Sequence, residues 1–195
     1  MRPARPVPYN LNVYGEADFA AGSFNICFAN AGKTAVLQVR SGNSGAGPWT
    51  YTVGEHAEIS DTWQLTANNL TGYDLAVYGP NGFLRAFRGS IVTGKANLEL
   101  RTSCSDDGDS IGLRGCNRGS ETVTVQLTDV YSGKVRSFDL KPGQLGSQQF
   151  DLDRTFGWYD FIVEVEQDPS FSYQIAGHVE SGKESRTDPA IGTTV

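Results

Sequence analysis

Hydrophobic and polar positions alternate with a period of two along several short segments of this chain. Val123, Val125 and Leu127 are separated by threonine and glutamine, and residues 159–166 repeat the pattern with larger side chains. Period-two alternation places one face of a strand in a core and the other face in water. No long stretch keeps apolar residues at a 3.6-residue period, so the pattern predicts an all-β fold.

The same order of segments occurs twice, with an offset of about 87 residues. The clearest corresponding pairs are Asn30–Gly32 with Asn117–Gly119, Tyr73–Val77 with Tyr159–Val163, and Phe83–Gly89 with Phe171–Gly177. Any one match could arise because β proteins share composition. Several matches in one register favour an internal repeat.

Each copy carries signals for six or seven short strands, joined by turns such as Gly79–Gly82. This spacing predicts two tandem immunoglobulin-like β-sandwiches, over residues 9–92 and 96–192. The short polar stretch between them implies that the two sandwiches touch. The proline-rich residues 1–8 predict a stiff linker from an upstream segment, with Met1 as the start of an excised fragment.

Composition narrows the choice of partner. The formal net charge is −6 and no block of Lys or Arg stands out, which argues against a nucleic-acid partner. An acidic surface is repelled by anionic lipid but not by zwitterionic lipid. There is no run of about 18 apolar residues of the kind that spans a membrane. The sequence contains no HExxH, GxSxG or P-loop motif, so we expect no catalytic residues and no cofactor in this chain.

Six segments carry a family resemblance: Pro48–Val53, Asp61–Trp63, Tyr73–Gly89, Trp158–Phe161, Ala176–Ser185 and Asp188–Gly192. Together they resemble the C-terminal repeats of the bacterial phosphocholine-preferring phospholipases C. The resemblance covers nearly the whole chain, and the run from Tyr73 to Gly89 is its most specific part.

The resemblance implies an upstream catalytic domain that hydrolyses phosphatidylcholine or sphingomyelin and releases phosphocholine. It also implies export, and therefore a secreted or periplasmic location. This chain is then a non-catalytic accessory region that packs on the catalytic domain and secondarily aids contact with a phosphatidylcholine-containing membrane. Two alternatives remain: a free-standing β-sandwich binding module unrelated to lipid, and a small enzyme with an unfamiliar site.

Aromatic residues supply the first candidate site. Trp49, Trp63, Tyr78 and Trp158, together with Tyr51, could form a cage for a choline group through cation–π contacts. The competing interpretation is that these side chains fill the sandwich cores.

Arg85 supplies a second candidate, because it falls on the predicted core face of its strand, between Phe83 and Phe87. It could pair with a carboxylate, extend past the sheet edge, or bind an anion such as a phosphate. We favour the structural ion pair.

Two further hypotheses concern one segment of the second repeat. Asp106, Asp107 and Asp109 could hold Ca²⁺ on a loop, but the distal Glu of an EF-hand is missing and a solvated turn is the favoured interpretation. Because the resemblance implies an oxidising compartment, Cys104 and Cys116 could form a disulfide across a hairpin. The alternative is two reduced thiols on neighbouring strands.

Overall fold

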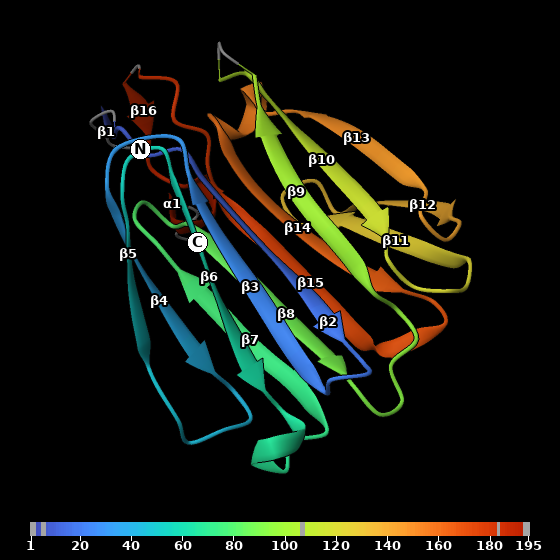
Figure 1. The fold of residues 1–195 in the computed structure, drawn as a ribbon. Coiled ribbons are helices and arrows are strands. Elements are labelled where there is room, and N and C mark those ends of the chain that lie inside the picture. Colours follow the sequence, from blue (N-terminus) through green and yellow to red (C-terminus); the bar gives the residue numbers. More distant parts are fainter. Residues whose placement is uncertain (1–2, 5–6, 106–107, 183, 193–195) are drawn as a thin grey trace.

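The computed structural model describes residues 3–4, 7–105, 108–182 and 184–192. Almost all of the regular structure is β-strand, as predicted (Figure 1). The first repeat contains β2 (Leu11–Asp18), β3 (Ser23–Asn30), β4 (Ala35–Ser41), β5 (Trp49–Val53), β6 (Ala57–Gln64), β7 (Gly72–Tyr78) and β8 (Leu84–Ser90). The second contains β9 (Leu98–Cys104), β10 (Ser110–Asn117), β11 (Val123–Asp129), β12 (Lys134–Leu140), β13 (Leu145–Asp151), β14 (Trp158–Val165) and β15 (Asp168–His178).

The remaining elements are short. They are β1 (Pro3–Ala4), β16 (Ser185–Arg186), the 3₁₀ turns η1 (Thr66–Asn68) and η2 (Asp153–Thr155), and α1 (Pro189–Gly192). Strand β1 pairs antiparallel with β16, so part of the proline-rich segment lies against the end of the second repeat. In the described part of the chain, no helix has the length and apolarity needed to cross a bilayer.

The two repeats have the same strand arrangement. In each, the first, second and fifth strands form one sheet, in the orders β2-β3-β6 and β9-β10-β13. The other four strands run in the order fourth, third, sixth, seventh, which gives β5-β4-β7-β8 and β12-β11-β14-β15. Buried positions alternate along β7, β8, β11 and β15, as the period-two pattern predicts.

The last strands of the two repeats pair with each other. Residues 84–88 of β8 lie antiparallel to residues 172–176 of β15, which joins the two four-stranded sheets into one sheet of eight strands (Figure 1). The two repeats thus share a continuous backbone ladder, a closer association than the contact between sandwiches expected from the sequence. The period-two pattern identified the strands, but it does not say that two edge strands from different repeats become neighbours.

The opposite layer is joined by side chains instead of a continuous backbone ladder. The amide of Asn12 on β2 donates to the Thr102 carbonyl of β9 at 3.0 Å and accepts from the Thr102 N–H at 3.4 Å. The amide of Asn97 makes the same two contacts with Ala17, at 2.8 and 3.4 Å. Each asparagine side chain thus donates to and accepts from the backbone of the other repeat, as a neighbouring peptide group would in a β-ladder.

Aromatic side chains from both repeats share one core. The Phe24 ring stacks on Tyr73 with 4.1 Å between centroids, and Phe87 meets Tyr173 edge-on at 5.0 Å. The hydroxyls of Tyr73 and Tyr173 lie 3.3 Å apart across the repeat boundary. The buried side chains form a single cluster that runs through both repeats.

The connection between the repeats is fixed by one buried carboxylate. Asp168 accepts hydrogen bonds from the backbone N–H groups of Lys95 at 2.7 Å and Ala96 at 2.9 Å, and from the Ser170 hydroxyl at 2.5 Å. Burial alone would raise the pKa of Asp168, but these donors lower it below its ordinary value of 3.8. The ionised form is therefore the one that holds the connection.

We predict that Asp168→Asn lowers the free energy of unfolding by about 1.5–3 kcal/mol at neutral pH, because an amide cannot accept from all of these donors. A lowered folded-state pKa means that the contribution is full above about pH 4 and is lost as the pH falls through that folded pKa. Urea unfolding between pH 3 and pH 7 tests this. The exposed Asp139→Asn is the matched control, and equal effects of the two substitutions would contradict the account.

Candidate functional site

Arg85 lies fully inside the molecule, with 1% of its surface exposed. Its Nη1 donates to the carbonyls of Leu84 and Ala176 at 2.8 and 2.9 Å. Its Nη2 donates to the Tyr159 hydroxyl at 3.1 Å and to Thr102 Oγ1 at 3.2 Å. Three of these four acceptors belong to the second repeat, so one guanidinium links both halves of the chain.

The favoured ion pair of Arg85 is wrong, since no carboxylate of the described residues pairs with it. Pairing of β8 with β15 places Arg85 opposite Ile175 in the sheet interior, where neutral oxygens surround it. The guanidinium also packs over the Phe83 ring, 4.3 Å from its centroid. Because the side chain is enclosed, it does not extend past the sheet edge either.

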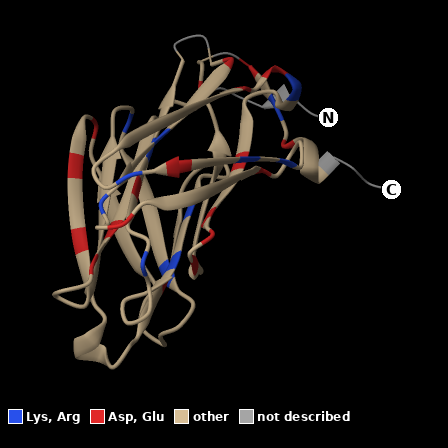
Figure 2. Cartoon of the chain, turned by 90° about the vertical axis from the view of Figure 1, so that its right-hand side faces the viewer, with Lys and Arg blue, Asp and Glu red and all other residues tan. Residues whose placement is uncertain are grey.

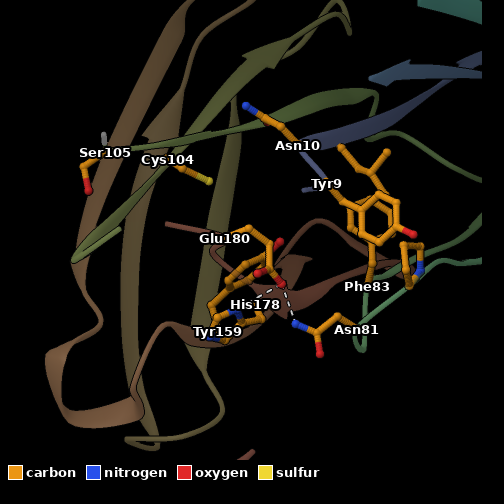
Figure 3. A pocket seen from close by; sticks show the side chains of 11 residues that line it. Tyr9, Asn10, Asn81, Phe83, Cys104, Ser105, Tyr159, His178 and Glu180 are labelled. Atoms are coloured by element: carbon orange, nitrogen blue, oxygen red, sulfur yellow. Dashed lines mark hydrogen bonds and ion pairs between the residues drawn. The ribbon is translucent and has the colours of Figure 1, made fainter. Parts of the chain in front are cut away.

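A pocket of about 230 Å³ opens next to Arg85, at the junction of the repeats. Tyr9, Asn81 and Phe83 of the first repeat and Tyr159 and His178 of the second are among its lining residues. Figure 3 shows His178, Tyr159 and Glu180 gathered on one side, with Cys104 and Ser105 on another. We call it the junction pocket.

A hydrogen-bond network closes one wall of the junction pocket (Figure 3). His178 Nδ1 lies 3.2 Å from Glu180 Oε1, and His178 Nε2 lies 3.0 Å from the Phe156 carbonyl oxygen. Asn81 donates to the same carboxylate oxygen, and the Val7 N–H approaches Oε2 at 3.4 Å. Both ring nitrogens of His178 thus lie within hydrogen-bond distance of oxygen atoms of the protein. The network holds residue 7 and the β7–β8 turn against β15.

Cys104 contributes a free thiol to the junction pocket. Burial raises the pKa of Cys104, although the nearby charge of Arg85 acts in the opposite direction. A reactive cysteine needs a lowered thiol pKa. The pKa shift of Cys104 thus runs opposite to the one that activates a thiol.

The structure divides the aromatic candidates between several places. Trp49 and Trp63 lie together, with ring centroids 5.5 Å apart, and Tyr51 lies beside Trp63. Tyr78 is exposed under the guanidinium of Arg40. Trp158 packs against His178 in the second repeat and donates its indole N–H to the Arg186 carbonyl at 2.7 Å. A single cage built from all of them is therefore wrong.

The Trp49–Trp63 pair borders a groove of about 320 Å³ in the first repeat, which we call the tryptophan groove. Leu65, Leu70 and Leu75 form apolar parts of its wall, and the side chains of Asn43, Gln64 and Asn68 are among the polar ones. Leu75 lies on β7, whereas Pro80 and Asn81 of the junction pocket follow the end of that strand.

The predicted disulfide is also wrong, because Cys27, Cys104 and Cys116 are all free thiols. In the β9–β10 pair, Cys104 lies opposite Ile111 and Cys116 lies opposite Glu99. Glu99 is five residues from Cys104 along β9, or about 17 Å at roughly 3.4 Å per residue. A disulfide requires Cα atoms closer than about 7 Å.

The calcium hypothesis rests mainly on residues without a described position. Asp106 and Asp107 lie outside the described residues. Asp109 is described, and its carbonyl accepts from the Leu152 N–H at 2.8 Å. Within the described ranges, no three His, Cys, Asp or Glu side chains are placed to hold a metal ion together.

Comparison with known proteins settles the family. The chain matches the bacterial phospholipase C, C-terminal domain family over residues 3–90 and 96–178. It belongs to this family. The two matched segments correspond to the two halves of the fold, and the internal repeat predicted from the sequence is confirmed by the repeated strand order.

Curated relatives of this C-terminal domain are much longer proteins. A non-hemolytic phospholipase C of Burkholderia pseudomallei is 42% identical over 99% of this chain, and the match covers 28% of that relative. A non-hemolytic phospholipase C of Pseudomonas aeruginosa is 35% identical over 98% of the chain and 29% of the relative. A hemolytic phospholipase C of the same organism is 29% identical over 97% of the chain, and the match covers 30% of that relative. The chain thus spans less than a third of each.

Sequence reasoning missed the residues that form the junction pocket of this family member. The sequence marks Asn81 only as a turn residue, and His178 and Glu180 only as part of the segment 176–185 that carries the resemblance. The available signal was the His-x-Glu spacing at the end of a strand, which places both side chains on the same side of the backbone. Their partners, Asn81 and residue 7, come from distant parts of the chain.

We predict that Arg85→Met destabilises the protein by about 3 kcal/mol or more, because it leaves buried carbonyl and hydroxyl oxygens without a donor. Denaturant unfolding followed by tryptophan fluorescence measures this. Arg88→Met, at an exposed position on the same strand, is the control and should change stability by less than about 0.5 kcal/mol. If Arg85→Met lowers the free energy of unfolding no more than Arg88→Met does, water replaces the guanidinium and the prediction is wrong.

Proposed function

We propose that this chain is the non-catalytic accessory region of a phospholipase C and acts by packing on the catalytic part of that enzyme. The observation that carries the proposal is the family match over both halves of the chain, combined with relatives more than three times its length. The substrate is then phosphatidylcholine or sphingomyelin, cleaved to release phosphocholine, and the enzyme is exported. These properties come from the resemblance of the Tyr73–Gly89 segment and its companions.

Within this proposal, the repeats span residues 9–92 and 96–192, and each is an immunoglobulin-like sandwich. The supporting feature is the strand arrangement, in which three strands face four in each repeat. Fibronectin-type domains share this sandwich architecture without sharing sequence. The two sandwiches are fused through their last strands.

The docking face lies at the end of the molecule that carries the junction pocket. There, β1 pairs with β16, and the Val7 N–H contacts Glu180, so the N-terminal segment is held at this end. The same end presents two apolar side chains, Val130 at 45% and Ile191 at 79% exposure. The Tyr131 hydroxyl binds Asp188 at 2.7 Å and holds their two segments together. Exposed apolar side chains of this kind mark interaction surfaces when they gather.

Lipid contact has a secondary role in this proposal. Figure 2 shows acidic and basic residues interspersed along the strands in that view, without one basic patch. With a net charge of −6, electrostatic attraction to anionic lipid is weak. A second candidate function, a ligand-binding module, is favoured by one observation, the open tryptophan groove.

We predict that Val130→Asp combined with Ile191→Asp, in a full-length phospholipase C that carries this chain, lowers hydrolysis of phosphatidylcholine several-fold, because two new charges disrupt an apolar contact. Val36→Asp, at an exposed position on β4, is the matched control and should leave activity unchanged. The isolated chain should release no phosphocholine above buffer. Full activity of the double variant would contradict docking at this end.

A further inference from the structure

The tryptophan groove has the geometry of a preformed binding site. It lies between the β4–β5 loop, the end of β6, the η1 turn and β7. The rings of Trp49 and Trp63 meet at 85° and form a corner, and both side chains are only partly buried. Leu65 and Leu75, each 2% exposed, anchor the apolar wall in the core.

A glycine holds Trp49 in this corner. A Cβ atom at Gly47 would lie 2.9 Å from the Trp49 ring, and the backbone there has φ of +95°, which favours glycine. The loop therefore closes against the indole face without a side chain between them. The polar rim is held in place as well, because the Asn43 amide donates to the Gly72 carbonyl at 2.8 Å and accepts from the Ser41 hydroxyl at 3.0 Å.

The chemistry of the groove is polar but uncharged. All of its lining residues are tryptophan, leucine, alanine, glycine, serine, asparagine or glutamine. In the described part of the chain, the indole N–H groups of Trp49 and Trp63 and the side-chain amide of Gln64 have no protein partner. The site thus offers hydrogen-bond donors and acceptors beside two aromatic surfaces.

We propose that the tryptophan groove binds a neutral sugar ring. A sugar presents an apolar C–H face, which stacks on an indole, and hydroxyl groups, which pair with amides and indole N–H groups. A charged ligand would find no counter-charge among the lining residues, and a simple acyl chain would leave the amides unsatisfied. The volume of about 320 Å³ lies at the small end of ligand sites. The sugar can belong to a soluble oligosaccharide or to a glycolipid headgroup.

Fluorescence of the full chain tests the site directly. The chain contains three tryptophans, so Trp158→Phe leaves Trp49 and Trp63 as the only indole reporters. We expect maltotriose, cellotriose or chitotriose to change this emission saturably. Phosphocholine and octanoate, tested as charged and acyl-chain probes, should not. No response to any of the three saccharides up to about 20 mM, or a response to phosphocholine or octanoate alone, would overturn the proposal.

Substitutions of exposed side chains test saccharide binding without changing the core of the protein. Gln64→Ala changes an exposed side chain that has no partner among the described residues, and it should weaken binding about 5- to 10-fold, as expected for a lost hydrogen bond. Trp49→Ala should abolish binding. Tyr78→Ala removes an exposed aromatic outside the groove and should have no effect; if it weakens binding as much as Trp49→Ala, the site lies elsewhere.

Vesicles distinguish the two sources of the sugar. Co-sedimentation with phosphatidylcholine vesicles that contain digalactosyl diacylglycerol, but not with phosphatidylcholine alone, would support a glycolipid headgroup. Saturable binding of a soluble saccharide without such sedimentation would support an oligosaccharide. Sedimentation with phosphatidylcholine alone that is lost in Trp49→Ala would instead assign the groove to phosphatidylcholine and refute the sugar. All of these readouts use the chain without a catalytic domain, so failure of the docking proposal would leave them unchanged.

Discussion

Strands β8 and β15 would each be an exposed sheet edge if the two repeats were separate domains. Unpaired edges attract further strands, and proteins usually cover them. Here the two edges pair with each other through residues 84–88 and 172–176. This pairing places Arg85 in the interior, where carbonyl and hydroxyl oxygens from both repeats bind its guanidinium. It also brings Tyr73 and Tyr173 into one aromatic core.

The rest of the junction depends on that alignment. With the repeats fixed side by side, Asp168 reaches the connecting segment and Asn12 and Asn97 bridge the opposite layer. The junction pocket forms where the two halves meet, and Glu180 links residues 7, 81 and 178 there. The tryptophan groove, in contrast, is built within the first repeat alone. The proposed docking surface, at the end with the junction pocket, is therefore separate from the tryptophan groove, which suits a small ligand.

The sequence predicted the parts of this fold that depend on local patterns. Period-two alternation found strands such as β11 and β14, and the 87-residue offset found the repeat. It could not predict which edges pair, because alternation identifies a buried face but no neighbour. For the same reason, the pattern alone favours a carboxylate partner for Arg85 and leaves the register between Cys104 and Cys116 undetermined. The Trp49–Trp63 pair was among the candidates, but its separation from Trp158 follows only from the tertiary structure.

Pairing of β8 with β15 should make the two repeats one cooperative folding unit. Native-state hydrogen exchange measures this directly, because amides that open only on global unfolding report the full free energy of unfolding. We expect the backbone amides at the β8–β15 ladder to be protected as strongly as those of the central strands β3 and β14. Much faster exchange of that ladder, together with separate protection levels for the two repeats, would contradict it.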